Sequence, residues 1–311
     1  MITVKNIEEA QQQIERVVIR TPLIPLKFYE RPDTWLKCEN LQRGGAFKIR
    51  GAYNKISRLE NPKGVVAYSS GNHAQAVALA SKLLSIPSTI VMLNKSVPQK
   101  LEQTRNYGAE VILGGETSQE IKERAEAIGK ERGWEIIPPF NDPEIIAGAG
   151  TVGMEILEDL PDVKSVVVPI GGGGLCAGIL SAIKQAKPEV KIFGVEPEGA
   201  PAMLRSLEAG KLVTLPKTET IADGLKPVRV GELTFEITAH LIDNIVTVDD
   251  EAILEAARHL VWMEKLVVEP SGAATFAAIR SGKIALPEGP AAIVVSGGNA
   301  DLGRMLGMTP K

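Results

Sequence analysis

The sequence predicts an α/β protein of two lobes, each built on a mainly parallel, twisted sheet flanked by helices. Three observations support this expectation. Strand-like apolar runs alternate with helical patterns along most of the chain. The length of 311 residues corresponds to roughly two domains of about 150 residues. The composition, 44% hydrophobic and 23% charged, is typical of globular proteins that bury a large core.

Residues 51–140 have the pattern of consecutive strand–helix units, and we assign them to a smaller lobe. Strands are expected at 64–70, 87–93, 109–113 and 134–137, and helices at 72–84, 97–107 and 117–130. Gly108 is placed to end the second of these helices. Thr117 and Glu120 have the spacing of a capping box at the start of the third.

Residues 1–50 and 141–311 are assigned to a larger lobe. Strands are expected at 165–170, 191–195, 244–248 and 291–295, and helices at 143–160, 201–209, 251–265 and 270–280. Another helix is expected after the glycines 171–174, within a strand–glycine–helix unit at 165–182. The stretch 211–230 has several Thr and Pro residues and is expected to be irregular. A ligand is expected between the lobes, at the carboxyl ends of the strands.

Composition excludes several classes of function. A net charge of −3 and an aromatic content of 4% give no attraction for nucleic acid. No uninterrupted apolar run approaches the ~18 residues of a membrane span, and the acidic, glutamine-rich start lacks the apolar core of a leader. Cys38 and Cys176 form no metal or redox motif, so a reducing, cytoplasmic location is expected. The partner is therefore expected to be a small molecule, with no nucleic acid and no membrane.

A run of four glycines, Gly171–Gly174, separates a strongly apolar strand from a helix. Glycine is poor inside helices, but it lets backbone N–H groups close around an anion at a helix start. The run therefore predicts a phosphate cradle. Gly172, Gly174 and Ala177, with Glu196 after the next strand, also match the dinucleotide fingerprint, so a nicotinamide enzyme stays open.

Three other segments could carry chemistry. In Ser69–His73 a strand ends in two hydroxyls and a helix begins, which suits a carboxylate, although Ser70 or Asn72 could simply cap the helix. Lys48, between glycine-rich flanks, could form a Schiff base or be a surface lysine. Ser296, after the last apolar strand, could contact a bound ring or begin a turn.

Together these segments resemble fold-type II pyridoxal-phosphate enzymes, in the threonine dehydratase (threonine deaminase) and serine racemase branch. The motifs occur in that family's order at 37–42, 47–52, 69–73, 171–174, 221–224, 269–272 and 296–299. Ile49 follows the lysine where cysteine and threonine synthases usually have aspartate, which favours the dehydratase branch. The resemblance implies the two-lobed fold of this class and pyridoxal 5'-phosphate as cofactor.

The resemblance also implies residue roles. Lys48 would carry the cofactor and take the α-proton of the substrate. The other expected cofactor-binding residues are Phe47, Asn72, Gly171, Gly172, Gly173, Gly174, Gly224, Glu269 and Ser296. The expected substrate-binding residues are Ser69, Ser70, Gly71, Asn72 and His73. Ser70 would lie on the ring face opposite Lys48, where it is an acid or base in related racemases.

Some relatives bind a divalent metal through a glutamate, a backbone carbonyl and an aspartate. Glu196 and Ala200 match the first two positions, but Ala202 stands at the third, so the implied metal site is incomplete.

The activity implied is dehydration and deamination of L-threonine, and of L-serine, to 2-oxobutanoate or pyruvate and ammonia. A cytoplasmic homodimer or homotetramer in amino-acid metabolism, including isoleucine biosynthesis, is expected. Serine racemase activity, alone or alongside dehydration, is the nearest alternative. A nicotinamide-dependent oxidoreductase and a non-catalytic amino-acid binder are the alternatives from other classes.

Overall fold

The computed structural model describes residues 2–307 except residues 28, 30 and 32. The larger of two sheets is formed by β1 (Leu23–Pro25), β2 (Thr34–Cys38), β7 (Ser165–Pro169), β8 (Lys191–Pro197), β9 (Asn244–Val248) and β10 (Ala291–Val295). Its strand order is β1-β2-β10-β7-β8-β9; the β1–β2 pair is antiparallel and the other pairs are parallel.

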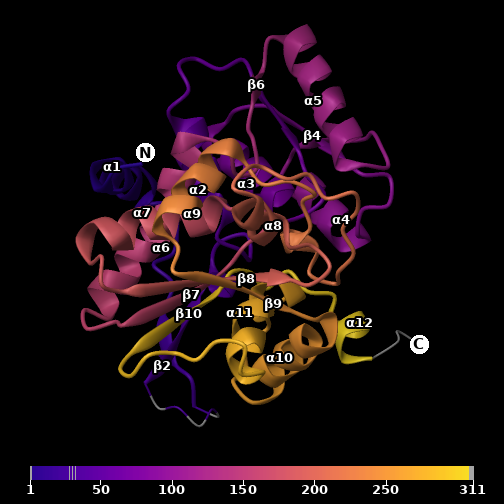
Figure 1. The fold of residues 1–311 in the computed structure, drawn as a ribbon. Coiled ribbons are helices and arrows are strands. Elements are labelled where there is room, and N and C mark those ends of the chain that lie inside the picture. Colours follow the sequence, from indigo (N-terminus) through magenta and orange to yellow (C-terminus); the bar gives the residue numbers. More distant parts are fainter. Residues whose placement is uncertain (1, 28, 30, 32, 308–311) are drawn as a thin grey trace.

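The smaller sheet is formed by β3 (Val65–Tyr68), β4 (Ser88–Met92), β5 (Glu110–Leu113) and β6 (Glu135–Ile136). Its order is β5-β4-β3-β6, and its pairs are all parallel. Figure 1 places this sheet and α5 (Ser118–Arg132) at one end of the molecule and the larger sheet toward the other. The predicted α/β fold with two mainly parallel sheets is therefore confirmed.

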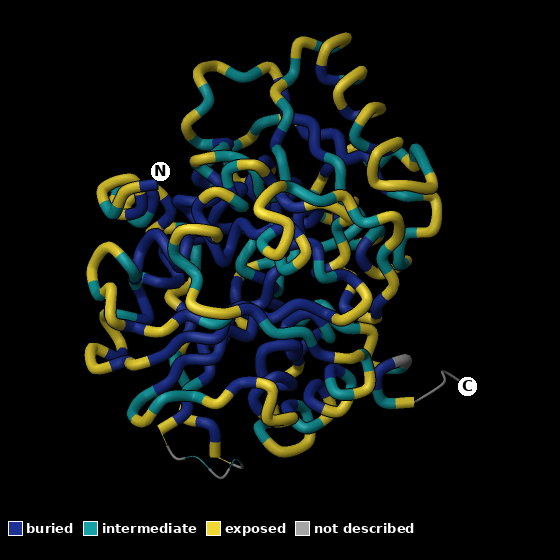
Figure 2. The backbone as a smooth tube through the Cα atoms, viewed as in Figure 1, coloured by how far each residue is buried: buried dark blue, intermediate teal, exposed yellow. Residues whose placement is uncertain are grey.

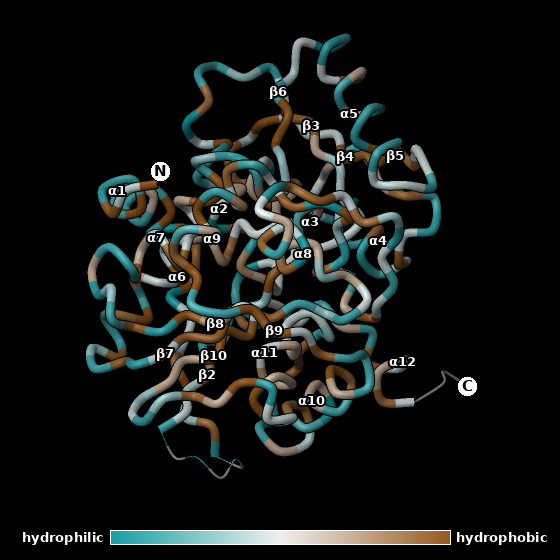
Figure 3. The backbone as a smooth tube through the Cα atoms, viewed as in Figure 1, coloured by the Kyte–Doolittle hydropathy of each residue, from teal (hydrophilic) through white to brown (hydrophobic). Residues whose placement is uncertain are grey.

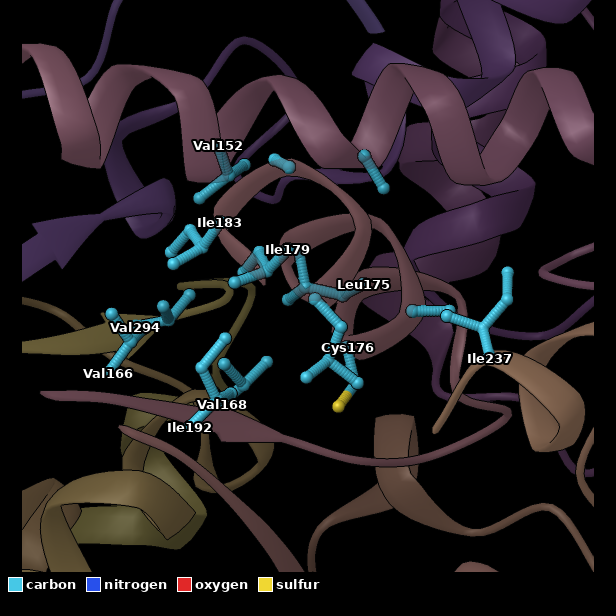
Figure 4. Packing of buried hydrophobic residues seen from close by; sticks show 14 of the residues in the cluster. Val152, Val166, Val168, Leu175, Cys176, Ile179, Ile183, Ile192, Ile237 and Val294 are labelled. Carbon is cyan, nitrogen blue, oxygen red and sulfur yellow. The ribbon is translucent and has the colours of Figure 1, made fainter. Parts of the chain in front are cut away.

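Helices cover both faces of the larger sheet (Figure 1). On one face lie α1 (Val4–Ile14), α6 (Pro143–Asp159), α7 (Gly174–Ala186) and α9 (Glu232–Leu241), and on the other α10 (Asp250–Trp262) and α11 (Pro270–Arg280). Figure 4 shows Ile179 and Ile183 of α7 packed between Val152 of α6 and strand residues such as Val166. Figures 2 and 3 show that the buried, hydrophobic part of the fold includes the central strands of the larger sheet, and α7 and α11 are buried over most of their length.

The helix α2 (Lys48–Ser57) packs against both α3 (Asn72–Leu84) and the start of α6. The helices α2 and α6 touch through their backbones: a Cβ atom at Gly148 would lie 2.5 Å from Arg50 O. Glycine is therefore required at position 148, and this contact fixes the first turn of α2.

Local signals predict several elements correctly. The bounds of α3, α11 and β10 are those expected from the sequence. Asp142 caps α6 by accepting from Glu144 N and Ile145 N. The capping box at Thr117 is half right, because Glu120 accepts from Glu116 N instead of from Thr117 N.

Several elements were not predicted: α1, β1, β2, α2, α9 and the short α12 (Leu302–Leu306). The remaining helices are α4 (Pro98–Asn106) and α8 (Ala202–Ala209), and two 3₁₀ turns span Glu39–Leu41 and Asp223–Leu225. No helix within the described residues is both long and apolar enough to span a membrane.

Candidate active site

The Lys48 segment lies beside the segment around Ser296. Phe47 N donates a hydrogen bond to Ser296 O at 3.2 Å, and Ala46 forms a bridge with Gly297. Ser296 follows β10 directly, so Lys48 begins α2 at the carboxyl edge of the larger sheet. The structure therefore brings together two predicted site segments that are far apart in the sequence.

Lys48 is half-buried, and its Nζ donates to Pro139 O at 2.7 Å. It lies 5.1 Å from the centre of the Phe47 ring. Burial lowers the pKa of Lys48 from 10.5 to about 8. A lysine with a lowered pKa is neutral more often near neutral pH, and the neutral amine is the nucleophile and base. Lys48 is therefore not an ordinary surface lysine.

His73 is buried near this amine. Its Nε2 lies 2.9 Å from Ile137 O, so the ring proton is on Nε2 and is donated to that carbonyl. Burial, and then the charge of Lys48, lowers the pKa of His73 to about 3. The ring is therefore neutral at neutral pH and is poorly suited to carry a proton during a reaction.

Asn72 connects the two sheets across the site. Its Nδ2 donates to Glu269 Oε1, and its Oδ1 accepts from Asn299 Nδ2 at 2.9 Å. Asn299 Nδ2 also donates to Gly44 O at 2.9 Å. The N-cap residue of α3 is Gly71, and Asn72 is the first residue of the helix, so the capping alternative for Asn72 is wrong. Its side chain is instead held by Glu269, which precedes α11, and by Asn299, which follows β10.

A buried lysine not singled out from the sequence contributes to the site. Lys100 Nζ lies 2.6 Å from Asp223 Oδ2 and 3.5 Å from Glu269 Oε2. Burial raises the pKa of Glu269 to about 7, although the charge of Lys100 acts against this shift. Lys100 is in the first turn of α4, where a cation is unfavourable because of the helix dipole. This unfavourable position was the signal in the sequence that could have marked Lys100 as a site residue.

The glycine run packs tightly against its surroundings. A Cβ atom at Gly171 would lie 2.7 Å from Gly224 O, and one at Gly172 would lie 2.0 Å from Phe140 Cδ1. The backbone of Gly173 has a φ of 93°, which favours glycine. Gly173 also precedes α7 as its N-cap and has no side chain to bond the first N–H groups of the helix. These groups fit a phosphate.

Replacing Gly172 with alanine should weaken cofactor binding by about 10- to 100-fold. The added methyl group would overlap the Phe140 ring, and overpacking of this kind costs about 1–3 kcal/mol. The measurement is a fluorescence titration of cofactor-free protein with pyridoxal phosphate. Phe140→Leu removes the ring that the added methyl group would overlap. The Gly172→Ala, Phe140→Leu double variant should therefore regain part of the lost affinity. Equal affinity in Gly172→Ala and the wild type would contradict the cradle.

The other predicted loop residues have local partners. Ser69 Oγ accepts from Gly71 N at 3.2 Å, and Ser70 Oγ accepts from Leu93 N at 2.8 Å. The Ser70 side chain therefore bonds the end of β4 and does not cap α3, so the capping alternative for Ser70 is also wrong.

Glu196 lies in β8 of the larger sheet, where backbone N–H groups bind its carboxylate. It is fully buried, and its two carboxylate oxygens accept from Met203 N and Leu204 N, both at 2.8 Å. Burial raises its pKa to about 7. These bonds satisfy the first N–H groups of α8. The dinucleotide interpretation requires a carboxylate that is free to bind a ribose, and this one is not. Among the described residues, no group of three or more His, Cys, Asp or Glu side chains is arranged to hold a metal.

Comparison with known families agrees with this geometry. The pattern described as "Pyridoxal-phosphate dependent enzyme" matches residues 14–297. The chain belongs to this family. Its cofactor is therefore pyridoxal phosphate, and the nicotinamide alternative is set aside.

Curated relatives cover nearly the whole chain. An L-threonine ammonia-lyase of Thermotoga maritima is 46% identical over 308 residues, which are 97% of this chain and 77% of that protein. "L-threonine dehydratase catabolic TdcB" of Staphylococcus aureus is 42% identical over 318 residues, covering 99% of this chain and 92% of that protein.

Solved structures show the same fold. A threonine deaminase from the organism abbreviated T.th. superposes with a TM-score of 0.92 at 42% identity, covering 96% of this chain and 99% of that one. Maize serine racemase superposes with a TM-score of 0.93 at 39% identity, covering 98% of this chain and 96% of that one. The predicted resemblance to fold-type II enzymes of this branch is confirmed.

Proposed function

We propose that this enzyme is a lyase that converts L-threonine, and also L-serine, to 2-oxobutanoate or pyruvate and ammonia. The observation that carries the proposal is the Lys48 amine, which has a lowered pKa and lies at the edge where the Ser296 segment meets α2. The names of the relatives from Thermotoga maritima and Staphylococcus aureus support the substrate class.

Bound pyridoxal phosphate supplies the electron sink for the charge left when an α-proton is removed. Lys48 would hold the cofactor covalently and would take that proton. The proposed contacts with the cofactor are Gly171–Gly174 to the phosphate, Phe47 and Gly224 to the ring faces, Asn72 to the ring hydroxyl and Ser296 to the ring nitrogen. Glu269 acts through Asn72, whose side-chain amide donates to it.

The segment Ser69–His73 is proposed to bind the substrate carboxylate with backbone N–H groups and hydroxyls. Ser70 is proposed to face the side of the ring opposite Lys48. Because the His73 ring is neutral and its Nε2 donates to Ile137 O, we assign this residue a backbone role. Expulsion of the β-hydroxyl as water then needs one base, Lys48, whereas racemisation needs a second proton donor on the other face.

One assay tests the proposal directly. Purified enzyme with pyridoxal phosphate is supplied with L-threonine, L-serine and 3-hydroxyaspartate, and 2-oxo acids are measured together with D-serine. Formation of 2-oxobutanoate from L-threonine supports the lyase, whereas D-serine from L-serine, with no 2-oxo acid from any of the three substrates, supports the racemase alternative. The D-serine measurement is necessary because the chain is similar to maize serine racemase. A non-catalytic binder would form neither product.

We also propose the lobe boundaries 51–140 and 1–50 with 141–311, a homodimer or homotetramer, and a cytoplasmic role in amino-acid metabolism. Light scattering with the purified protein tests the assembly.

Isoleucine biosynthesis is one proposed role, although the Staphylococcus aureus relative is named as catabolic. We propose that Glu196 and Ala200 do not form a metal site, because the Glu196 carboxylate caps α8.

A further inference from the structure

The Ser70 hydroxyl is held by two partners from the segment that follows β4. Leu93 N donates to Ser70 Oγ at 2.8 Å, and the Ser96 and Ser70 hydroxyl oxygens lie 2.9 Å apart. Ser96 Oγ also lies 2.6 Å from Leu93 O. Ser70 and Ser96 are both half-buried, and their contact joins the ends of two neighbouring strands of the smaller sheet.

The direction of these hydrogen bonds follows from counting protons. A carbonyl oxygen can only accept, so the single Ser96 proton is donated to Leu93 O at 2.6 Å. The two hydroxyl oxygens lie 2.9 Å apart. With the Ser96 proton on Leu93 O, a hydrogen bond between the hydroxyls uses the Ser70 proton, which is then donated to Ser96 Oγ. Ser70 thus accepts from Leu93 N while its own proton points to Ser96.

We propose that Ser96 is a positioning residue that withholds the Ser70 proton from the substrate and so favours elimination over racemisation. This inference rests on the proposed function, in which Ser70 faces the side of the ring opposite Lys48. To racemise an amino acid, Ser70 must give its proton to Cα after Lys48 has taken one from the other face, and water must then reprotonate Ser70. The hydrogen bond to Ser96 has to break before that transfer. Elimination uses Lys48 as its base and does not require this step.

Ser96→Ala and Ser96→Val test the inference. The first removes the acceptor of the Ser70 proton, and the second also fills the space that a water could occupy. We expect racemisation of L-alanine to rise by about three- to tenfold, the effect of losing one hydrogen bond of ordinary net strength. L-Alanine has no β-hydroxyl to eliminate, so its racemisation reports protonation alone. The rate of 2-oxobutanoate formation from L-threonine should stay within about twofold.

Two controls make the result specific. Ser96→Thr keeps the hydroxyl and should behave as the wild type, and adding Ser70→Ala to Ser96→Ala should remove the gain. In cofactor-free protein, hydrogen exchange of the Leu93 amide should remain slow in Ser96→Ala and become faster in Ser70→Ala, because Leu93 N donates to Ser70. That readout is independent of activity.

Each outcome decides the inference. Unchanged or slower racemisation of L-alanine in both Ser96→Ala and Ser96→Val overturns it, as does a gain that persists without Ser70. Loss of Leu93 amide protection in Ser96→Ala also overturns it, because Ser96 would then be a structural support for the loop. If the wild type forms no 2-oxo acid from threonine or serine, the proposed lyase function fails, while the L-alanine measurement still judges the role of Ser96.

Discussion

Replacing Lys48 with alanine should lower 2-oxo acid formation by at least about 10⁴-fold, because the amine both binds the cofactor covalently and removes the α-proton. The side chain is half-buried at the start of α2, and burial lowers its pKa to about 8. The measurement is 2-oxobutanoate release from L-threonine. In parallel, mass spectrometry after borohydride reduction should find the cofactor on the wild-type peptide that contains Lys48 and on no peptide of the variant.

Lys55→Ala is the matched control for this prediction. Lys55 lies on the same helix two turns later, where its Nζ pairs with Asp142 at 2.9 Å. This variant should keep the cofactor adduct and most of the activity, and circular dichroism should show both variants folded. A reduced cofactor adduct on another lysine, or activity above a trace in Lys48→Ala, would falsify the assignment.

Replacing Arg50 with alanine should destabilise the protein by about 3–5 kcal/mol, the usual cost of breaking a buried ion pair by removing one partner. Arg50 is fully buried, and its guanidinium donates to both oxygens of Glu39 and both oxygens of Glu155. Lys37, also fully buried, pairs with Glu155 at 2.6 Å. Without Arg50, two buried carboxylates would share one buried cation.

Urea denaturation measures this effect as a lower midpoint at an unchanged slope. Arg50→Lys should recover little, because one ammonium cannot replace a planar guanidinium that bonds two carboxylates. Arg50→Met combined with Glu39→Gln removes one charge of each sign and should be more stable than Arg50→Met alone. A loss below about 1 kcal/mol in Arg50→Ala would show that the buried network contributes little.

Acid should weaken the same network. Burial acts to raise the pKa of Glu39, but the charge and hydrogen bonds of Arg50 hold it below the ordinary 4.5. A carboxyl group with a lowered folded-state pKa contributes its full stability above pH ~4.5 and loses it as the pH falls through the folded-state pKa. The urea concentration at the denaturation midpoint should therefore decrease as the pH is lowered below ~4.5. The decrease should be smaller in a Glu39→Gln, Arg50→Met variant.

The elements predicted correctly from the sequence are those with complete local signals. The helix α11 begins with Pro270, the strand β10 is a short apolar run, and α3 begins directly after Ser70 and Gly71, which follow β3. By contrast, β2 was missed because Lys37 interrupts its apolar pattern, and that lysine is buried by an ion pair made elsewhere in the chain. The helix α1 was missed because Ile7, Ala10 and Ile14 are its only buried residues among glutamates and glutamines.

By itself the sequence determined the alternation of strands and helices and the likeness to pyridoxal-phosphate enzymes, and it singled out Gly171–Gly174 and Lys48 as candidates for the site. Each strand, helix and motif is a local signal of residue types at short spacings, and the likeness to the family rests on the order of such motifs along the chain. Only the tertiary structure decided that Lys100 pairs with Asp223 and Glu269, that Arg50 joins Glu39 to Glu155, and that Ser96 bonds Ser70. Each of these contacts joins residues distant in sequence, and a buried charge or hydroxyl is stable only where its partner is brought to it by the fold.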